Sequence, residues 1–151
     1  MIALDTNILV YAHREDSPWY DRAYQCVVDC AQGRSAWAIP WPCLYEFLAI
    51  VTHPRIYDPP TPLSKAIDQL DAWLESPSLT VLAEPEHFSY WQMLRALLNK
   101  SRVMGPQIHD ARIVALCCIH GIRELWTADR GFGRFPELRT RNPLMYPSIP
   151  S

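Results

Sequence analysis

Short apolar runs alternate along the chain with longer segments in which apolar residues recur at helical spacing. The short runs are typical of buried strands, and the longer segments are typical of helices with one face in a core. The predicted strands cover residues 2–4, 35–40, 78–82 and 122–127. The predicted helices cover residues 18–32, 42–52, 61–75, 86–99 and 107–120. A further segment, near residues 142–145, is a candidate for pairing at the edge of the sheet.

Capping signals set the ends of two of these helices. Ser17 followed by Pro18 predicts a helix start, because serine caps a helix and proline fits its first turn. Gly33 and Gly121 predict the ends of the helices that precede them. Asp5, Thr6 and Asn7 stand where the first strand ends and a helix begins.

Strands that alternate with helices predict an α/β fold around a mainly parallel sheet. The 151 residues fit a single domain, residues 1–151, and show no internal repeat. Ligands of such sheets bind beyond the carboxyl ends of the strands. This rule selects Asp5, after the first strand, and Asp129, after the strand that ends at Thr127.

Composition excludes several classes of protein. Apolar residues make up 49% and charged residues 20%, which is ordinary for a globular protein. The five glycines form no GxGxxG or GxxxxGK[ST] spacing and there is no GxSxG, which excludes dinucleotide, P-loop and nucleophile-elbow sites. Five cysteines without a CxxC argue against a disulfide framework. With neither a membrane span nor a basic signal-peptide start in the sequence, we expect a cytoplasmic protein.

Charge is distributed unevenly along the chain. Residues 1–94 carry five Lys or Arg against twelve Asp or Glu, a net −7, whereas residues 95–141 carry nine against four, a net +5. Eight of those nine are arginines, which favour bidentate pairing with phosphate or carboxylate. A basic flank beside an acidic site suits a polyanion that is bound with metal ions, and a solvated surface is the plain alternative.

Four acids are the candidate catalytic residues, although each also has an ordinary structural explanation. Asp5, Asp110 and Asp129 stand at ends of strands or helices, where aspartate often caps a helix or turn. Glu46, inside an apolar helix, is of a type that is usually just solvated. Together, four carboxylates in one pocket would repel each other unless cations neutralised them. Oxygen ligands suit Mg²⁺ or Mn²⁺, which activate water for phosphodiester hydrolysis.

Polar neighbours of these acids are candidates for holding the carboxylates by hydrogen bonds. They are Thr6, Asn7 and Thr127. Six tryptophans could stack on bases, but most are expected to fill the core or an interface. Trp19 and Trp41, beside prolines, are expected to be the exposed pair.

Four segments, in order, resemble the motifs of PIN-domain ribonucleases, and most of all the VapC toxin branch. They are the opening Ile2-Ala3-Leu4-Asp5-Thr6-Asn7, the segment Leu44-Tyr45-Glu46-Phe47, the segment Ile108-His109-Asp110-Ala111-Arg112-Ile113-Val114-Ala115, and the segment Leu125-Trp126-Thr127-Ala128-Asp129-Arg130-Gly131-Phe132. The resemblance covers essentially the whole chain, although residues 55–100 match only in helical character. It implies an α/β/α sandwich with a mainly parallel sheet.

The resemblance also implies an endoribonuclease that depends on Mg²⁺ or Mn²⁺ and leaves a 5′-phosphate and a 3′-hydroxyl. Asp5, Asp110 and Asp129 would hold the metal, and Glu46 would bind or orient the water. Family members usually pair with an antitoxin and often form homodimers, so RNA, an antitoxin and a second copy are the expected partners. Gly131 departs from the family, which commonly has an aspartate there, and this puts a second metal ion in doubt.

Arg112 and Arg130 are the candidates for contacting the substrate phosphate of this ribonuclease. Two other functions compete with this interpretation. A phosphatase with an aspartyl nucleophile at Asp5 needs a second aspartate two residues later, and Asn7 stands there. A module that binds RNA or protein without catalysis is the alternative that Gly131 favours.

Overall fold

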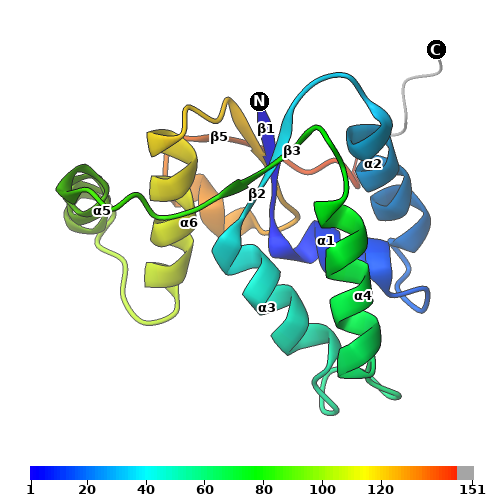
Figure 1. The fold of residues 1–151 in the computed structure, drawn as a ribbon. Coiled ribbons are helices and arrows are strands. Elements are labelled where there is room, and N and C mark those ends of the chain that lie inside the picture. The colour runs from blue at the N-terminus through cyan, green and yellow to red at the C-terminus, as the bar shows by residue number, and fades with distance from the viewer. Residues whose placement is uncertain (146–151) are drawn as a thin grey trace.

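The computed structural model describes residues 1–145, in which five parallel strands form one sheet in the order β3-β2-β1-β4-β5. The strands are β1 (Ile2–Leu4), β2 (Trp37–Pro40), β3 (Leu79–Leu82), β4 (Glu124–Trp126) and β5 (Arg139–Arg141). Helices flank the sheet: in Figure 1, α5 and α6 lie to its left and α2 and α4 to its right. The prediction of an α/β/α sandwich with a parallel sheet is confirmed.

Six α-helices and one short 3₁₀ helix are present in the described part of the chain. They are α1 (Thr6–His13), α2 (Tyr20–Gln32), α3 (Trp41–Val51), α4 (Leu63–Leu74), α5 (Phe88–Ser101), α6 (Gln107–Ile119) and η1 (Arg130–Arg134). None of them is long and apolar enough to cross a membrane. Gly121 follows α6 with a φ of +68°, the left-handed conformation that ends a helix at little cost in glycine.

The order of the strands decides where a ligand can bind. β1 occupies the centre, with Ile2 opposite Trp37 of β2 on one side and opposite Glu124 of β4 on the other. The chain builds β2 and β3 on one side of β1 and then crosses over to build β4 and β5 on the other. The carboxyl ends of β1 and β4 therefore flank the switch point, where α/β sheets bind their ligands.

The core explains why α6 has no polar face. All its residues from Ala111 to Cys117 except Arg112 are buried, as expected of a helix that is apolar nearly all round. β1 and β4 contribute Leu4 and Leu125, both without exposed surface. This rigid centre fixes the two strand ends that carry the predicted acids.

Several predicted elements begin about two residues later than expected, and two differences from the prediction have a clear local cause. The edge strand is Arg139–Arg141, not residues 142–145, because Asn142 begins a turn in which its Oδ1 accepts a hydrogen bond of 3.0 Å from the backbone of Leu144. Pro143 has no backbone donor for a strand ladder. The helix predicted from residue 18 begins at Tyr20, because Ser17 Oγ accepts from the backbone of Trp19 and caps a turn instead.

Candidate active site

One cavity of about 360 Å³ is lined by all four predicted acids, which come from segments far apart in the sequence. Asp5 follows β1, Glu46 lies in the second turn of α3, Asp110 lies in the first turn of α6, and Asp129 follows β4. Two are caps as well: Asp5 caps α1 and Asp129 caps η1. Capping and convergence on one cavity therefore coexist.

Asp5 is the buried acid of the group, with 4% of its surface exposed. Its Oδ1 accepts a hydrogen bond of 2.8 Å from the backbone of Thr6. Its Oδ2 accepts from Thr127 Oγ1 at 2.7 Å and from Asn7 Nδ2 at 3.2 Å. The Cys43 thiol donates a longer contact of 3.6 Å to Oδ1. The carboxylate is thus fixed in one orientation at the end of the central strand.

Asn7 and Thr127 join the start of α1 to the loop after β4. The Asn7 amide donates to Thr127 Oγ1 at 3.2 Å, and its Oδ1 accepts from the backbone of Ala128 at 3.0 Å. Thr127 Oγ1 also accepts from the backbone of Asp129 at 3.0 Å. The two polar residues therefore hold both Asp5 and Asp129. An amide at position 7 exchanges no proton, which argues against the phosphatase.

Glu46 is held from the neighbouring helix. Thr6 Oγ1 donates a hydrogen bond of 3.0 Å to Glu46 Oε2, while the backbone of Thr6 donates to Asp5. The Glu46 side chain is otherwise exposed to the cavity and solvent. It is therefore an exposed carboxylate beside the buried carboxylate of Asp5.

Asp129 occupies the rim of the cavity on the other side. Its Oδ1 accepts a hydrogen bond of 2.8 Å from the backbone of Gly131. A methyl group at Gly131 would stand 3.0 Å from that same Oδ1. Glycine at this position therefore lets the backbone approach and orient Asp129, whatever it costs in metal ligands.

Burial and neighbouring carboxylates raise the pKa of two of the acids, Asp5 and Asp110. Burial raises the pKa of Asp5 to about 6 against hydrogen bonds from Thr127 and Thr6 that lower it, and the charge of Glu46 adds to the rise. Burial also raises the pKa of Asp110, as do the charges of Asp129 and Glu46. The pocket therefore holds negative charge that it does not neutralise by itself.

The donor set fits a hard divalent cation. All four acids offer carboxylate oxygens, the ligands that Mg²⁺ and Mn²⁺ prefer, and their mutual repulsion would be relieved by a bound cation. Within residues 1–145, no three acidic, histidine or cysteine side chains are already grouped as a ready-made metal cluster. The match is thus one of chemistry and charge around a shared cavity.

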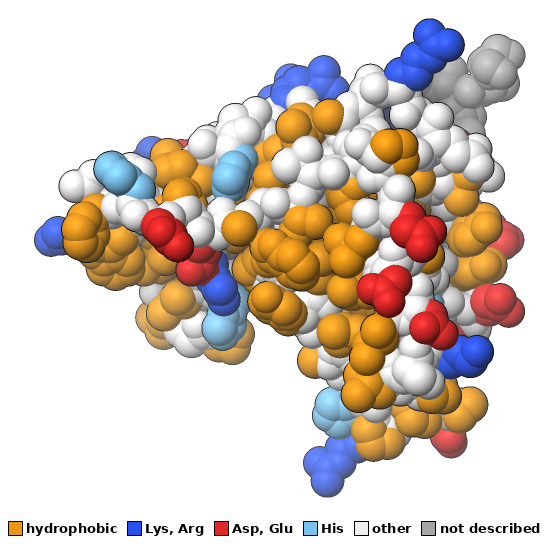
Figure 2. All heavy atoms as spheres, viewed as in Figure 1, with side chains coloured by type: hydrophobic (Ala, Val, Ile, Leu, Met, Phe, Trp, Pro, Cys, Tyr) orange, Lys and Arg blue, Asp and Glu red, His pale blue; other side chains and the backbone are white. Residues whose placement is uncertain are grey.

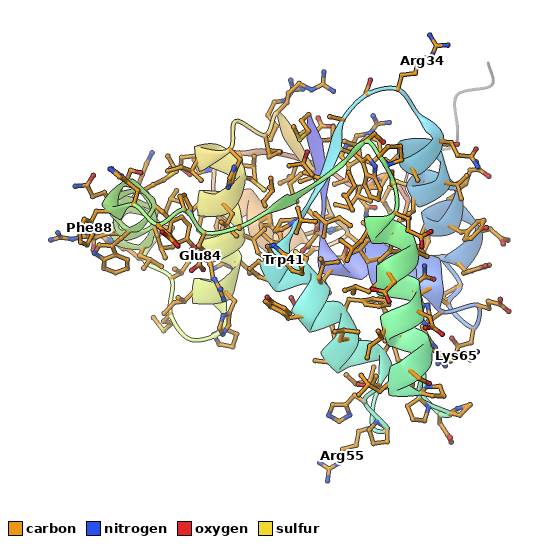
Figure 3. All side chains as sticks on the ribbon, viewed as in Figure 1. Arg34, Trp41, Arg55, Lys65, Glu84 and Phe88 are labelled. Carbon is orange, nitrogen blue, oxygen red and sulfur yellow. The ribbon has the colours of Figure 1, made fainter. Side chains whose placement is uncertain are left out.

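The two predicted phosphate contacts differ in position. Arg112 is not brought to the acids, because its Nε donates a hydrogen bond of 2.6 Å to Glu84, which lies between α5 and α6 (Figure 3). Arg130, next to Asp129, is exposed and lines a second cavity that shares Asp129 with the first. Arg130 alone of this pair lies beside the acids.

Sequence reasoning missed Arg134 as a residue of this site. Its positive charge offsets part of the rise that burial and the neighbouring acids cause in the pKa of Asp110, and its Nε donates to the Gly131 carbonyl at 3.0 Å. The signal was available, because Arg134 ends the same short segment that begins with Arg130. Only the 3₁₀ turn of η1 brings it back toward Asp110.

The loop between α3 and α4 forms a wall of the cavity that sequence reasoning did not find. Ile56 and Tyr57 line the cavity from this loop. The Arg14 guanidinium lies 4.2 Å from the centre of the Tyr57 ring and donates to the Pro59 carbonyl at 3.0 Å. Arg14 therefore anchors the wall from the end of α1.

A family model described as the PIN domain matches residues 2–138. The parallel sheet, the switch point at β1 and β4, and the carboxylate cavity beyond them are the features that this match spans. The chain belongs to the PIN domain family, and the resemblance seen in the sequence is confirmed.

Its relatives within that family are VapC ribonucleases. Ribonuclease VapC48 of Mycobacterium tuberculosis is 30% identical over 139 residues, which are 92% of this chain and 94% of the relative. Ribonuclease VapC43 of the same organism is 33% identical over 144 residues, which are 95% of this chain and 96% of the relative. The likeness therefore extends over nearly the full length of both chains.

Solved structures confirm the fold at lower identity. VapBC2 from Rickettsia felis, crystallised on a DNA fragment of its promoter, aligns with a TM-score of 0.63 and 23% identity, covering 94% of this chain and 98% of that one. VapC20 of Mycobacterium tuberculosis, a toxin that cleaves the sarcin–ricin loop, aligns with a TM-score of 0.63 and 16% identity, covering 92% and 99%.

Proposed function

We propose that this protein is an endoribonuclease that hydrolyses RNA with Mg²⁺ or Mn²⁺ and serves as the toxin of a toxin–antitoxin pair. The observation that carries the proposal is the convergence of Asp5, Glu46, Asp110 and Asp129 on one cavity at the switch point of a PIN fold. The names of the VapC relatives support the same activity. RNA as the substrate makes the cytoplasm the proposed place of action.

Each acid has a role that follows from its surroundings. Asp5, Asp110 and Asp129 would hold the cation, which when bound supplies charge neutralisation and an activated water. Glu46, exposed to the cavity and held by Thr6, orients the attacking water and accepts its proton. Asp5 would hold the cation in a fixed orientation, because both of its carboxylate oxygens are hydrogen-bonded.

Exposed apolar surface supports protein partners, which we propose to be an antitoxin and a second copy of the chain. Figure 2 shows apolar side chains gathered over α5 and over the region of α3 and α4. On α5, Phe88 is 81% exposed and Trp91 is 51% exposed. Tyr45 and Leu63 are exposed on the other two helices. Patches of this kind on a small protein mark interaction surfaces.

The test combines metal binding with cleavage. Calorimetric titration with Mn²⁺ and cleavage of total cellular RNA are compared for wild type, Asp5→Asn and the control Asp71→Asn, an exposed acid on α4. We expect Asp5→Asn to lose both metal binding and cleavage with its circular dichroism spectrum unchanged, and Asp71→Asn to behave as wild type. RNA binding by wild type without cleavage in excess Mn²⁺ would instead establish the non-catalytic module.

The toxin role is tested in cells. Expression of the wild type should arrest growth, and co-expression of the neighbouring open reading frame should relieve the arrest. The Asp5→Asn variant should not arrest growth. Cleavage in vitro without growth arrest would indicate a housekeeping nuclease.

A further inference from the structure

A second cavity, of about 400 Å³, opens directly beside the carboxylates. Tyr11 and Asp129 line both cavities, so the two are neighbours. The second one is lined further by an exposed tryptophan, Trp19, by Arg130, and by the polar side chain of Thr140. It thus combines an aromatic surface, a cation and hydrogen-bonding groups at the edge of the proposed catalytic site.

Trp19 is presented to this cavity by a fixed turn. The residue is 41% exposed, although burial of a large apolar side chain is favourable in free energy. Its backbone N–H donates to Ser17 Oγ at 3.1 Å, and its carbonyl accepts from the backbone of Ala23 at 3.0 Å. Trp41, by contrast, is half-buried and stacked on Tyr45, with ring centres 5.7 Å apart. Of the two tryptophans expected to be exposed, Trp19 alone offers its ring beside the acids.

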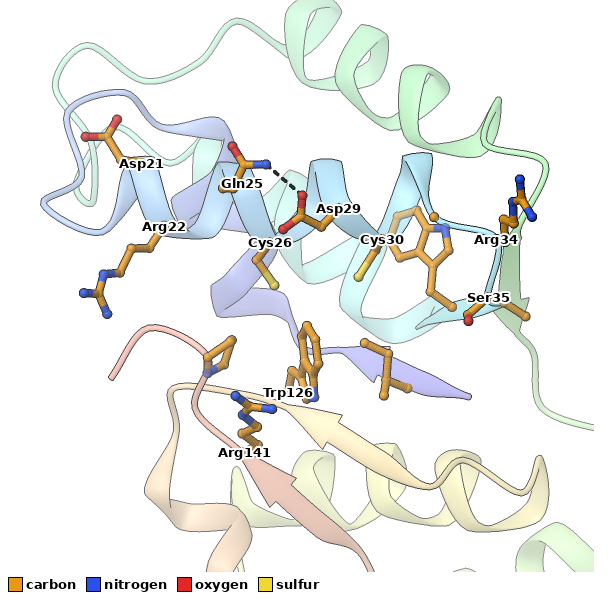
Figure 4. A pocket seen from close by; sticks show the side chains of 15 residues that line it. Asp21, Arg22, Gln25, Cys26, Asp29, Cys30, Arg34, Ser35, Trp126 and Arg141 are labelled. Atoms are coloured by element: carbon orange, nitrogen blue, oxygen red, sulfur yellow. Dashed lines mark hydrogen bonds between the residues drawn. The ribbon is translucent and has the colours of Figure 1, made fainter. Parts of the chain in front are cut away.

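Arg130 is the cation that faces this cavity from the catalytic side. It follows Asp129 directly and is exposed. Arg141 also lines the cavity, but its guanidinium is 5.7 Å from the ring centre of Trp126, in the neighbouring and larger cavity beneath α2 (Figure 4). Arg130 is therefore better placed than Arg141 to pair with a backbone phosphate of an RNA strand that extends from the carboxylate cavity into the second one.

We propose that the second cavity is a nucleotide subsite, in which the base next to the scissile phosphate stacks on Trp19 and a backbone phosphate pairs with Arg130. The assignment rests on the proposed ribonuclease function. A base stacks on an aromatic face whatever its identity, and an arginine pairs with phosphate in bidentate geometry. The cavity lies in the low hundreds of Å³, at the small end of the range for ligand sites, which suits a single nucleotide. RNA of any sequence would thus gain affinity from the contacts with Trp19 and Arg130.

The test compares two exposed aromatic residues. Trp19→Ala removes the stacking surface, and Tyr24→Ala is the control, because Tyr24 is exposed on α2 and lines neither of these cavities. We expect Trp19→Ala to raise the KM for a single-stranded oligoribonucleotide about tenfold with kcat little changed, as loss of one base–aromatic stack predicts. Trp19→Phe keeps an aromatic ring and should retain most of the affinity. Tyr24→Ala should match wild type.

An abasic scan locates the base that stacks. The oligonucleotide is made with one abasic position at a time on either side of the cleavage site. Loss of the base at one flanking position should raise the KM of wild type. The same loss should have no further effect in Trp19→Ala, because the abasic position and the substitution remove the same contact. Additive penalties at every position would overturn the assignment. Arg130→Gln should weaken the binding of every oligonucleotide to the same extent and reduce the salt dependence of binding.

Binding without cleavage separates this inference from the proposed function. In an Asp5→Asn background, fluorescence anisotropy of a labelled oligonucleotide reports affinity alone, and Trp19→Ala should again weaken it about tenfold. If wild type cuts no RNA yet this loss is seen, the ribonuclease proposal fails and the subsite stands. Equal RNA affinities with and without Trp19 overturn the subsite, and a simultaneous loss of antitoxin binding would make the cavity a protein contact.

Discussion

Thr127 Oγ1 and Asp5 Oδ2 lie 2.7 Å apart, although 122 residues separate them in the chain. The hydroxyl of Thr127 has one proton to donate, and this geometry directs it to the carboxylate. The same oxygen accepts from the Asn7 amide and from the backbone of Asp129. One threonine therefore ties the acid after β1 to the acid after β4.

Replacing Thr127 by valine should preserve the fold and weaken the site. Valine fills a similar volume but returns none of these hydrogen bonds, so Asp5 loses its shortest partner. Removal of a group that orients a metal ligand typically costs 10–100-fold in metal affinity or activity, and we expect about that loss. Mn²⁺ calorimetry and RNA cleavage measure it. Thr80→Val, at an exposed position of β3, is the control and should leave both unchanged. Equal losses in the two variants would contradict the role of Thr127.

Gly131 should tolerate a methyl group less well than Gly133 does. A Cβ at Gly131 would meet Asp129 Oδ1 at 3.0 Å, whereas a Cβ at Gly133 meets nothing within 4 Å. Neither residue has the positive φ that would itself penalise alanine. Gly131→Ala should therefore displace Asp129 and cost about 1 kcal/mol in the activation free energy, close to a fivefold loss of kcat/KM. Gly133→Ala should be neutral, and parallel behaviour of the two variants would show that Asp129 is not positioned in this way.

Arg112→Gln should affect stability and not RNA cleavage. The guanidinium pairs with Glu84 on the far side of α6, with both side chains partly exposed, so its loss should lower the free energy of unfolding by about 1 kcal/mol or less. The KM for RNA should stay at the wild-type value. Urea unfolding and steady-state cleavage give the two quantities. A raised KM would restore the interpretation of Arg112 as a phosphate contact.

The position of Arg112 shows what helix geometry could have told from the sequence. Successive residues in an α-helix turn by about 100°, so Arg112 stands about 200° around α6 from Asp110. Asp5, Asp110 and Asp129 were found because they follow β1 and β4 or begin α6, which are local patterns. Their convergence depends on the strand order, in which β1 is paired on both sides, and no local pattern encodes that pairing.

Other parts of the fold escaped prediction for similar physical reasons. All three residues of β5 are exposed, so the strand has no apolar pattern to mark it. α1 begins directly after β1 at Thr6, and its apolar residues continue the run of the strand, so its extent was not defined. The wall at Ile56 and Tyr57 comes from a loop held by Arg14, a contact between segments far apart in the sequence.

The raised pKa of Asp5 predicts how stability depends on pH when no metal is present. The pKa of Asp5 is about 6 in the folded protein and near the ordinary value of 3.8 in the unfolded chain, so the folded state binds the proton more tightly. Stability from this group is therefore fully present below pH 4, falls as the pH rises toward 6, and changes little above that. The shift corresponds to about 3 kcal/mol in the free energy of unfolding.

Urea unfolding in EDTA between pH 4 and pH 8 isolates this effect by comparing wild type with Asp5→Asn. Every other titrating group is common to the two proteins, so the difference between their unfolding free energies reports Asp5. Asp5→Asn should gain stability relative to wild type as the pH rises from 4 to 7, because its amide never acquires a buried charge. Added Mn²⁺ should stabilise wild type most above pH 6, where Asp5 is ionised and able to hold the cation. A difference between the proteins that stays constant across this range would show that Asp5 is not protonated at pH 5, and that the site tolerates its charge without a cation.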